Sequence, residues 1–154
     1  MSDSSTREHD TAASANEAQS ANTNKYEVSA KLANDRTTQC TKFLTFARFI
    51  RDQSNFSLRS AGQHPSDEDK DGFRGLKQQW QDLLKNKMLE GAGEVLTKAF
   101  FDEAERELGK LDETNTATTE ASVAWQKVVS LVGECKQVEQ EVEQVMVKME
   151  SLLS

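Results

Sequence analysis

Histidine, cysteine and proline are scarce in this chain of 154 residues, which has two histidines, two cysteines and one proline. His9 lies in an opening rich in Ser, Thr and Asn, and His64 stands beside Pro65. Neither position offers the ligand cluster that zinc needs or the histidine of a rigid catalytic triad. The Gly-Ala-Gly segment at 91–93 lacks the spacing and the following Lys of a phosphate-binding loop. We therefore expect a protein that is not an enzyme and holds no cofactor.

Long apolar runs are absent as well. No stretch approaches the roughly 18 consecutive apolar residues of a membrane-spanning helix, and the opening lacks the basic start and apolar core of a secretory signal. A net charge of −7 argues against direct binding of nucleic acid, which depends on clustered Lys and Arg. These absences predict an intracellular protein, cytoplasmic or nuclear, with no membrane span and no direct contact with nucleic acid.

After Met1, residues 2–24 contain no large apolar side chain. Such a segment buries too little surface to offset the entropy that it loses on ordering. The composition therefore predicts a disordered tail over residues 1–23. The remaining residues, 24–154, are enough for one domain.

The last quarter of the chain carries the strongest pattern. Apolar residues recur there at alternating steps of three and four, which is typical of the a and d positions of a coiled coil or helical bundle. The pattern predicts a helix over 116–153. We call its a and d residues the heptad seam and treat them as candidate partner-binding residues: Val128, Leu131, Cys135, Val138, Val142, Val145, Met149 and Leu152.

Four of the five e positions beside the heptad seam are apolar, whereas a two-stranded coiled coil would place charges there. They are Trp125, Val132, Met146 and Leu153. So broad an apolar face is typical of a helix that contacts two or more neighbours. Two alternatives stay open: helices of the same chain cover the seam, or another chain does. Trp125 is a candidate for a boundary with another chain, because Trp is enriched at binding hot spots.

The first helix is expected over 25–52, after Asn24, a favourable N-cap residue. Phe43, Phe46 and Phe49 stand among other apolar residues in one short part of it. A helix turn that is apolar on nearly every side is normally buried on nearly every side. We therefore interpret this cluster either as the densest point of the core or as the anchor of an interface with a partner.

Positive charge is concentrated in the same region. From Lys25 to Arg59 the chain has seven basic residues and three acidic ones, while the remainder is strongly acidic. The simpler interpretation is that the basic first helix packs beside the acidic last helix. The alternative is a basic surface that is offered to an acidic partner.

A surface connection is expected after the first helix, over 53–72, where Gly62 and Pro65 interrupt the apolar pattern. Phe56 and Leu58 are expected to pack back from this connection onto the helices.

Helical periodicity returns over 66–111. Ser66 and Asp69 have the spacing of a capping pattern, which favours a helix start at this point. The glycines at 91 and 93 predict a break or kink, because each glycine in a helix interior costs roughly 1 kcal/mol relative to Ala. The alternative is that they permit another part of the backbone to approach closely.

Asp67, Asp69 and Asp71, followed by Gly72, resemble the first half of an EF-hand calcium loop. The second half departs from that pattern, because Gln78 stands where a Glu normally supplies two carboxylate oxygens. The simpler interpretation is a solvated, acidic helix start. The three aspartates remain the candidate ligands of an alternative function, a self-contained three-helix bundle that binds a ligand or Ca²⁺ through residues 67–72.

Cys40 and Cys135 lie on apolar faces of two predicted helices. Buried thiols in a reducing compartment are the ordinary explanation. A disulfide that joins the first and last helices is the alternative.

The predicted fold is all-α: an elongated three-helix bundle or coiled coil with a disordered N-terminal tail. Its general look is similar to short helical subunits of kinetochore, transcription-mediator or organelle-biogenesis complexes, in architecture only. The leading hypothesis is a scaffold or adaptor subunit that associates with other helical subunits, or with itself, through the heptad seam and the Phe-rich first helix. A membrane-surface helix is a further hypothesis, and the acidic polar face of the last helix argues against it.

Overall fold

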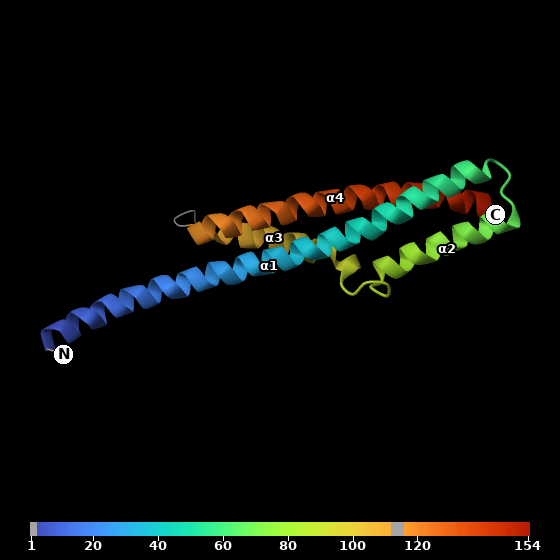
Figure 1. The fold of residues 1–154 in the computed structure, drawn as a ribbon. Coiled ribbons are helices and arrows are strands. Elements are labelled where there is room, and N and C mark those ends of the chain that lie inside the picture. Colours follow the sequence, from blue (N-terminus) through green and yellow to red (C-terminus); the bar gives the residue numbers. More distant parts are fainter. Residues whose placement is uncertain (1–2, 112–115) are drawn as a thin grey trace.

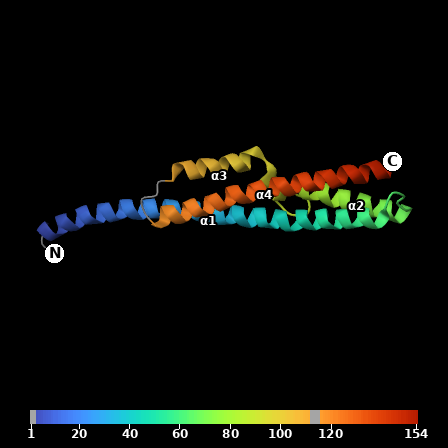
Figure 2. The same cartoon turned by 90° about the horizontal axis from the view of Figure 1, so that it is seen from above.

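The computed structural model describes residues 3–111 and 116–154, with side chains from residue 25 on apart from residue 117. This part of the chain contains helices and no strand. Two long helices, α1 (Asp3–Ala61) and α4 (Thr116–Leu153), run side by side (Figures 1 and 2). The chain returns between them through three shorter elements: α2 (Asp67–Leu84), the 3-10 helix η1 (Ala92–Leu96) and α3 (Lys98–Lys110). The predicted all-α, elongated three-helix bundle is confirmed, with α2, η1 and α3 together in place of one continuous middle helix.

The helices α1 and α4 are parallel. Trp125 Nε1 donates a hydrogen bond to Ser29 Oγ at 2.8 Å near the start of the shared interface. Further along both helices, Arg51 Nη1 donates to Glu141 Oε1 at 2.8 Å. From the first contact to the second, the residue numbers rise in both α1 and α4, as expected of parallel helices. The helices α2 and α3 run in the opposite direction (Figure 1). The last helix occupies the range that the heptad pattern predicts, 116–153.

The core is built where α1 meets α4 along one side and α2 along the other. Phe43 is fully buried, and its ring lies 6.2 Å from that of Trp80 in a tilted arrangement. Such aromatic pairs contribute beyond the area they bury. Trp80 Nε1 also donates to Glu143 of α4 at 2.8 Å, so this ring connects all three layers of the bundle.

The first helix ends at Ala61, later than the predicted residue 52. Nothing between 52 and 61 breaks a helix, and the stop comes at Gly62, whose φ of 67° and N–H bond to Leu58 O at 3.1 Å form a left-handed C-cap. At the other end, residues 3–24 of α1 extend past the remaining helices (Figures 1 and 2). The composition of this tail, which has no apolar face to bury, accounts for its position outside the bundle.

The predicted break in the second helical region is present, but it begins earlier than the glycines at 91 and 93, because α2 ends at Leu84. Asn86 then takes φ 62°, a left-handed conformation that Asn tolerates, and its Oδ1 accepts a hydrogen bond from Gly93 N at 2.7 Å. The backbone folds so tightly that a Cβ on Gly93 would lie 2.0 Å from Leu84 O. This turn lets α2 and α3 cover different parts of α4.

Candidate partner-binding surface

The heptad seam lies inside the bundle. Six of its residues are buried, and Leu131 and Leu152 are half-buried against the core. The helix α4 packs mainly on α1, with further contacts to α3, α2 and η1. The alternative that the sequence left open is therefore decided: the chain's own helices cover the seam. The candidate partner-binding residues Val128, Val138, Val142, Val145 and Met149 are therefore inaccessible to a partner unless the bundle opens, while the candidates Leu131 and Leu152 keep a partly exposed edge.

Trp125 belongs to the core and not to a boundary with another chain. Its side chain is fully buried, and its indole N–H is satisfied by Ser29 of α1. A buried Trp needs such a partner for its N–H. The expected e-position interface is thus an internal contact.

The Phe-rich part of α1 divides into two faces. Phe43 points into the core with Leu44, Ala47 and Ile50, which are all buried. Phe46 and Phe49 lie on the outer face and are 38% and 54% exposed. The expectation that this turn is buried on nearly every side is therefore wrong for Phe46 and Phe49, because no helix of the described residues covers the outer side of α1.

Phe56 lies on the same outer face. It is 59% exposed, so the expectation that it packs back onto the helices is wrong, whereas Leu58 is half-buried against the core. Since each helical residue turns about 100°, Phe46, Phe49 and Phe56 fall within about 80° of one another along about 15 Å of α1. We call these three residues the Phe stripe. It holds three of the seven large hydrophobic side chains that are exposed in the described part of the chain.

Sequence reasoning found two members of the stripe and missed the third. Phe56 stands seven residues after Phe49, which is a heptad spacing on one helix face. That relation was hidden because residues 53–72 were assigned to a connection. A longer first helix would have revealed it.

Two of the basic residues of α1 are used inside the bundle. Arg36 Nε donates to Glu103 of α3 at 2.7 Å, and this bond raises the pKa of the Arg36 guanidinium. Arg51 bonds Asp52 and Glu141, which also raises its pKa. The interpretation that the basic first helix packs beside the acidic last helix is therefore confirmed at Arg51, which pairs with Glu141 of α4, whereas Arg36 pairs with α3.

Three other basic residues of α1 remain exposed near the Phe stripe. They are Lys42, Arg48 and Arg59. None of them has an ion pair within the described residues. The outer face of α1 between 42 and 59 thus combines aromatic side chains with basic side chains that form no ion pair within the described residues.

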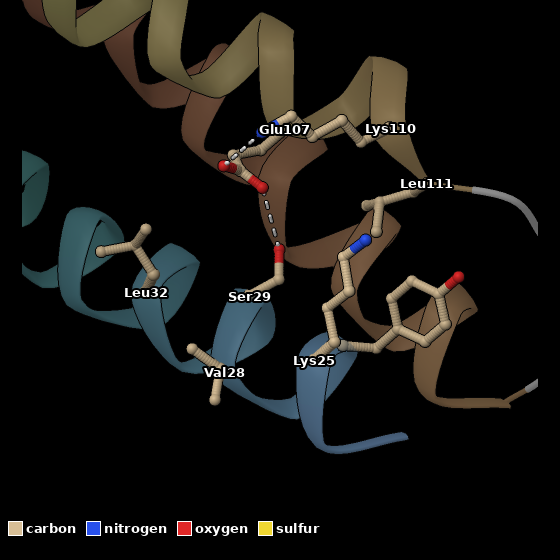
Figure 3. A pocket seen from close by; sticks show the side chains of 8 residues that line it. Lys25, Val28, Ser29, Leu32, Glu107, Lys110 and Leu111 are labelled. Atoms are coloured by element: carbon tan, nitrogen blue, oxygen red, sulfur yellow. Dashed lines mark hydrogen bonds and ion pairs between the residues drawn. The ribbon is translucent and has the colours of Figure 1, made fainter. Parts of the chain in front are cut away.

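A groove of about 320 Å³ lies between the start of the packed part of α1 and the end of α3 (Figure 3). At its centre Ser29 Oγ and Glu107 Oε2 are 3.5 Å apart, and Glu107 also pairs with Lys110 at 3.6 Å. Ser29 accepts the Trp125 bond as well. The polar groups at the centre of the groove are therefore already bonded to other residues of the chain. The groove is for this reason a less favourable candidate site than the Phe stripe.

The acidic run at 67–72 is not a calcium loop. Ser66 and Asp69 form a reciprocal capping box, with Asp69 N to Ser66 Oγ at 3.1 Å and Ser66 N to Asp69 Oδ2 at 2.9 Å. The predicted cap is confirmed, and it turns Asp67, Asp69 and Asp71 into residues of the first turns of α2. Alternate residues of a helix point about 200° apart, so the three carboxylates do not converge. No group of three potential metal ligands is found among the described residues.

Cys40 and Cys135 are both buried and free, and they face each other between α1 and α4. Cys135 Sγ lies 3.7 Å from Cys40 O. The contact with Cys40 and burial both raise the pKa of the Cys135 thiol. The ordinary interpretation of two structural thiols fits this placement.

No family model, curated protein or solved structure matches the chain. Within the described ranges, no helix combines the length and the apolar character needed to cross a membrane. The surface of the molecule itself is therefore the guide to its function.

Proposed function

We propose that this protein is a non-enzymatic helical adaptor, a subunit of a larger protein assembly, and that it binds a partner helix through the Phe stripe of α1. The observation that supports the proposal most is the exposure of three phenylalanines on one face of a helix whose opposite face is packed. Single exposed apolar residues are common on proteins and need no explanation. Three phenylalanines within a few turns of one face are less ordinary.

The exposed area of the Phe stripe sets an upper limit on the free energy that a partner gains by covering it. With about 200 Å² for a whole Phe side chain, the exposed fractions leave about 300 Å² of aromatic surface in water. Covering that area is worth up to about 7.5 kcal/mol at 25 cal/mol per Å², before the cost of association is subtracted. This is enough to anchor a moderate interface if a partner also contributes contacts around it.

The heptad seam has a different role in this proposal from the one that the sequence suggested. Its residues hold α4 against α1 and so support the helix that carries the Phe stripe. A binding surface on a packed helix loses little conformational entropy when a partner binds, which favours affinity. The seam builds the scaffold, and the Phe stripe provides the contact.

The test is site-specific photo-crosslinking in cells. A photoreactive amino acid is placed at Phe49, and in a matched control at Val147 of α4, which is 68% exposed. The expected result is a defined protein adduct from position 49 that is absent from position 147. Serine at Phe46 and Phe56 should greatly reduce that adduct. Equal adducts from both positions, or none from position 49, would contradict the proposal.

A further inference from the structure

We infer that the partner of the Phe stripe is an amphipathic helix whose apolar face is flanked by acidic side chains. This inference rests on the proposed function and adds the charge of the partner to it. It follows from the distribution of paired and unpaired charges along α1. The electrostatic pattern selects a partner even where each exposed pair adds little affinity.

The unpaired cations lie within the stripe and along one of its flanks. Lys42 stands four residues before Phe46 and falls within the angular range of the stripe. Arg59 and Arg48 lie about 60° and about 80° from Phe56 around the helix axis, both on the same flank of the stripe. All three side chains belong to exposed residues. A helix docked along the stripe would pass within reach of each of them.

Negative charge is almost absent from this part of α1. Asp52 is the single acidic residue between 42 and 59. Its Oδ1 already accepts a hydrogen bond from Arg51 Nε at 2.9 Å. The rest of the chain is acidic enough to give a net charge of −7. The outer face of α1 is therefore a local positive surface on a negative protein.

Two other occupants fit this surface less well. A second copy of α1 would bring cations against cations, which opposes a symmetric pairing. An anionic membrane would attract these cations but would repel a protein of net charge −7. An acidic helix satisfies both the aromatic stripe and the cations. A stripe of about 15 Å also matches two to three turns of such a helix.

The test uses two synthetic helical peptides, each ~20 residues long, with one shared leucine face. The acidic probe carries Glu on both flanks of that face, and the basic probe carries Lys at the same positions. Binding to the full chain is measured by fluorescence anisotropy. Two variants serve as controls: the Phe variant has Ser at Phe46, Phe49 and Phe56, and the charge variant has Glu at Lys42, Arg48 and Arg59. Circular dichroism checks that both variants fold, and Phe49→Ser alone replaces the Phe variant if that variant unfolds.

The acidic probe should bind about tenfold more tightly than the basic probe at low salt, as three exposed ion pairs allow. The ratio should shrink in high salt because the charges are screened. The charge variant should reverse the preference, and the Phe variant should bind neither probe. These results would support the inference.

Other outcomes would overturn it. If the two probes bind with equal affinity and the Phe variant binds neither, the inference of an acidic partner is wrong and the proposed function still holds. Binding that is unchanged in the Phe variant would remove the proposed function as well, and so would the failure of both probes combined with the absence of an adduct from position 49. If neither probe binds, the charge inference is wrong whatever the crosslinking shows. Stripe-dependent binding to phosphatidylserine vesicles, or a stripe-dependent dimer in light scattering, would identify a different occupant and also overturn it.

Discussion

Phe43 and Phe49 offer a direct test of the two faces of α1, because they are the same residue type on the same helix less than two turns apart. Phe43 is fully buried beside Trp80, whereas Phe49 is 54% exposed. Alanine at each position removes the same atoms. The two substitutions therefore differ only in what surrounds the ring.

The expected costs follow from these surroundings. Phe43→Ala leaves a cavity between α1, α2 and α4 and removes the aromatic contact, so we expect a loss of about 3–5 kcal/mol in the free energy of unfolding. Phe49→Ala loses only partial contacts along the helix surface, and alanine regains several tenths of a kcal/mol of helix propensity. The expected loss is below about 1 kcal/mol.

Urea denaturation followed by circular dichroism gives both values, and an unchanged slope with denaturant confirms that compactness is preserved. The difference between the two variants should be at least about 2 kcal/mol. Losses of similar size would refute the division of α1 into a core face and an outer face. A loss above about 2 kcal/mol for Phe49→Ala would show that another element covers the stripe in solution.

Two further substitutions test the turn after α2 and a partly buried carboxyl. Gly93→Ala should destabilise the fold strongly, because its Cβ would lie 2.0 Å from Leu84 O, whereas Gly133→Ala, with nothing within 4 Å, should stabilise it by up to about 1 kcal/mol in thermal melts; similar effects would contradict the tight turn. Burial, aided by neighbouring negative charge, raises the pKa of Glu139, so its ionised form opposes folding. Its contribution to stability is present at low pH and is lost as the pH rises through the raised pKa. Glu139→Gln should therefore gain melting temperature relative to the wild type from ~pH 3 to ~pH 7, unlike the exposed control Glu120→Gln; a pH-independent difference would contradict this.

Several features of the fold were predictable because they depend on local chemistry. Apolar residues recur along α4 at steps of three and four, and this spacing marks the buried face of the helix whichever element covers that face. The range of α4 and its apolar positions therefore follow from the sequence. The Ser66 cap involves groups only three residues apart, and the predicted hydrogen bonds are present. The glycines at 91 and 93 signalled a break because the backbone must turn sharply there. None of these inferences needs long-range information.

The features that were missed depend on what lies elsewhere in the chain. No local signal shows that α2 ends at Leu84, since the turn depends on Asn86 reaching Gly93. The end of α1 lies nine residues beyond the predicted residue 52, because the polar residues that follow 52 continue the helix as far as Ala61. Whether the heptad seam faces its own chain or another cannot be read from a pattern that both arrangements share. The exposure of Phe46 and Phe49 likewise follows only from how many helices surround α1.

The Phe stripe is not explained by the stability of the bundle. At an exposed helix position, Phe is a poorer helix former than Ala, Lys or Glu, and each ring leaves apolar surface in water. The fold would lose little if polar residues replaced these rings, whereas replacing Phe43 would cost several kcal/mol. Three such residues lie on one face, beside cations that lack partners in the described part of the chain. A partner that covers the rings and pairs with the cations accounts for both features, and the packing of this chain alone accounts for neither.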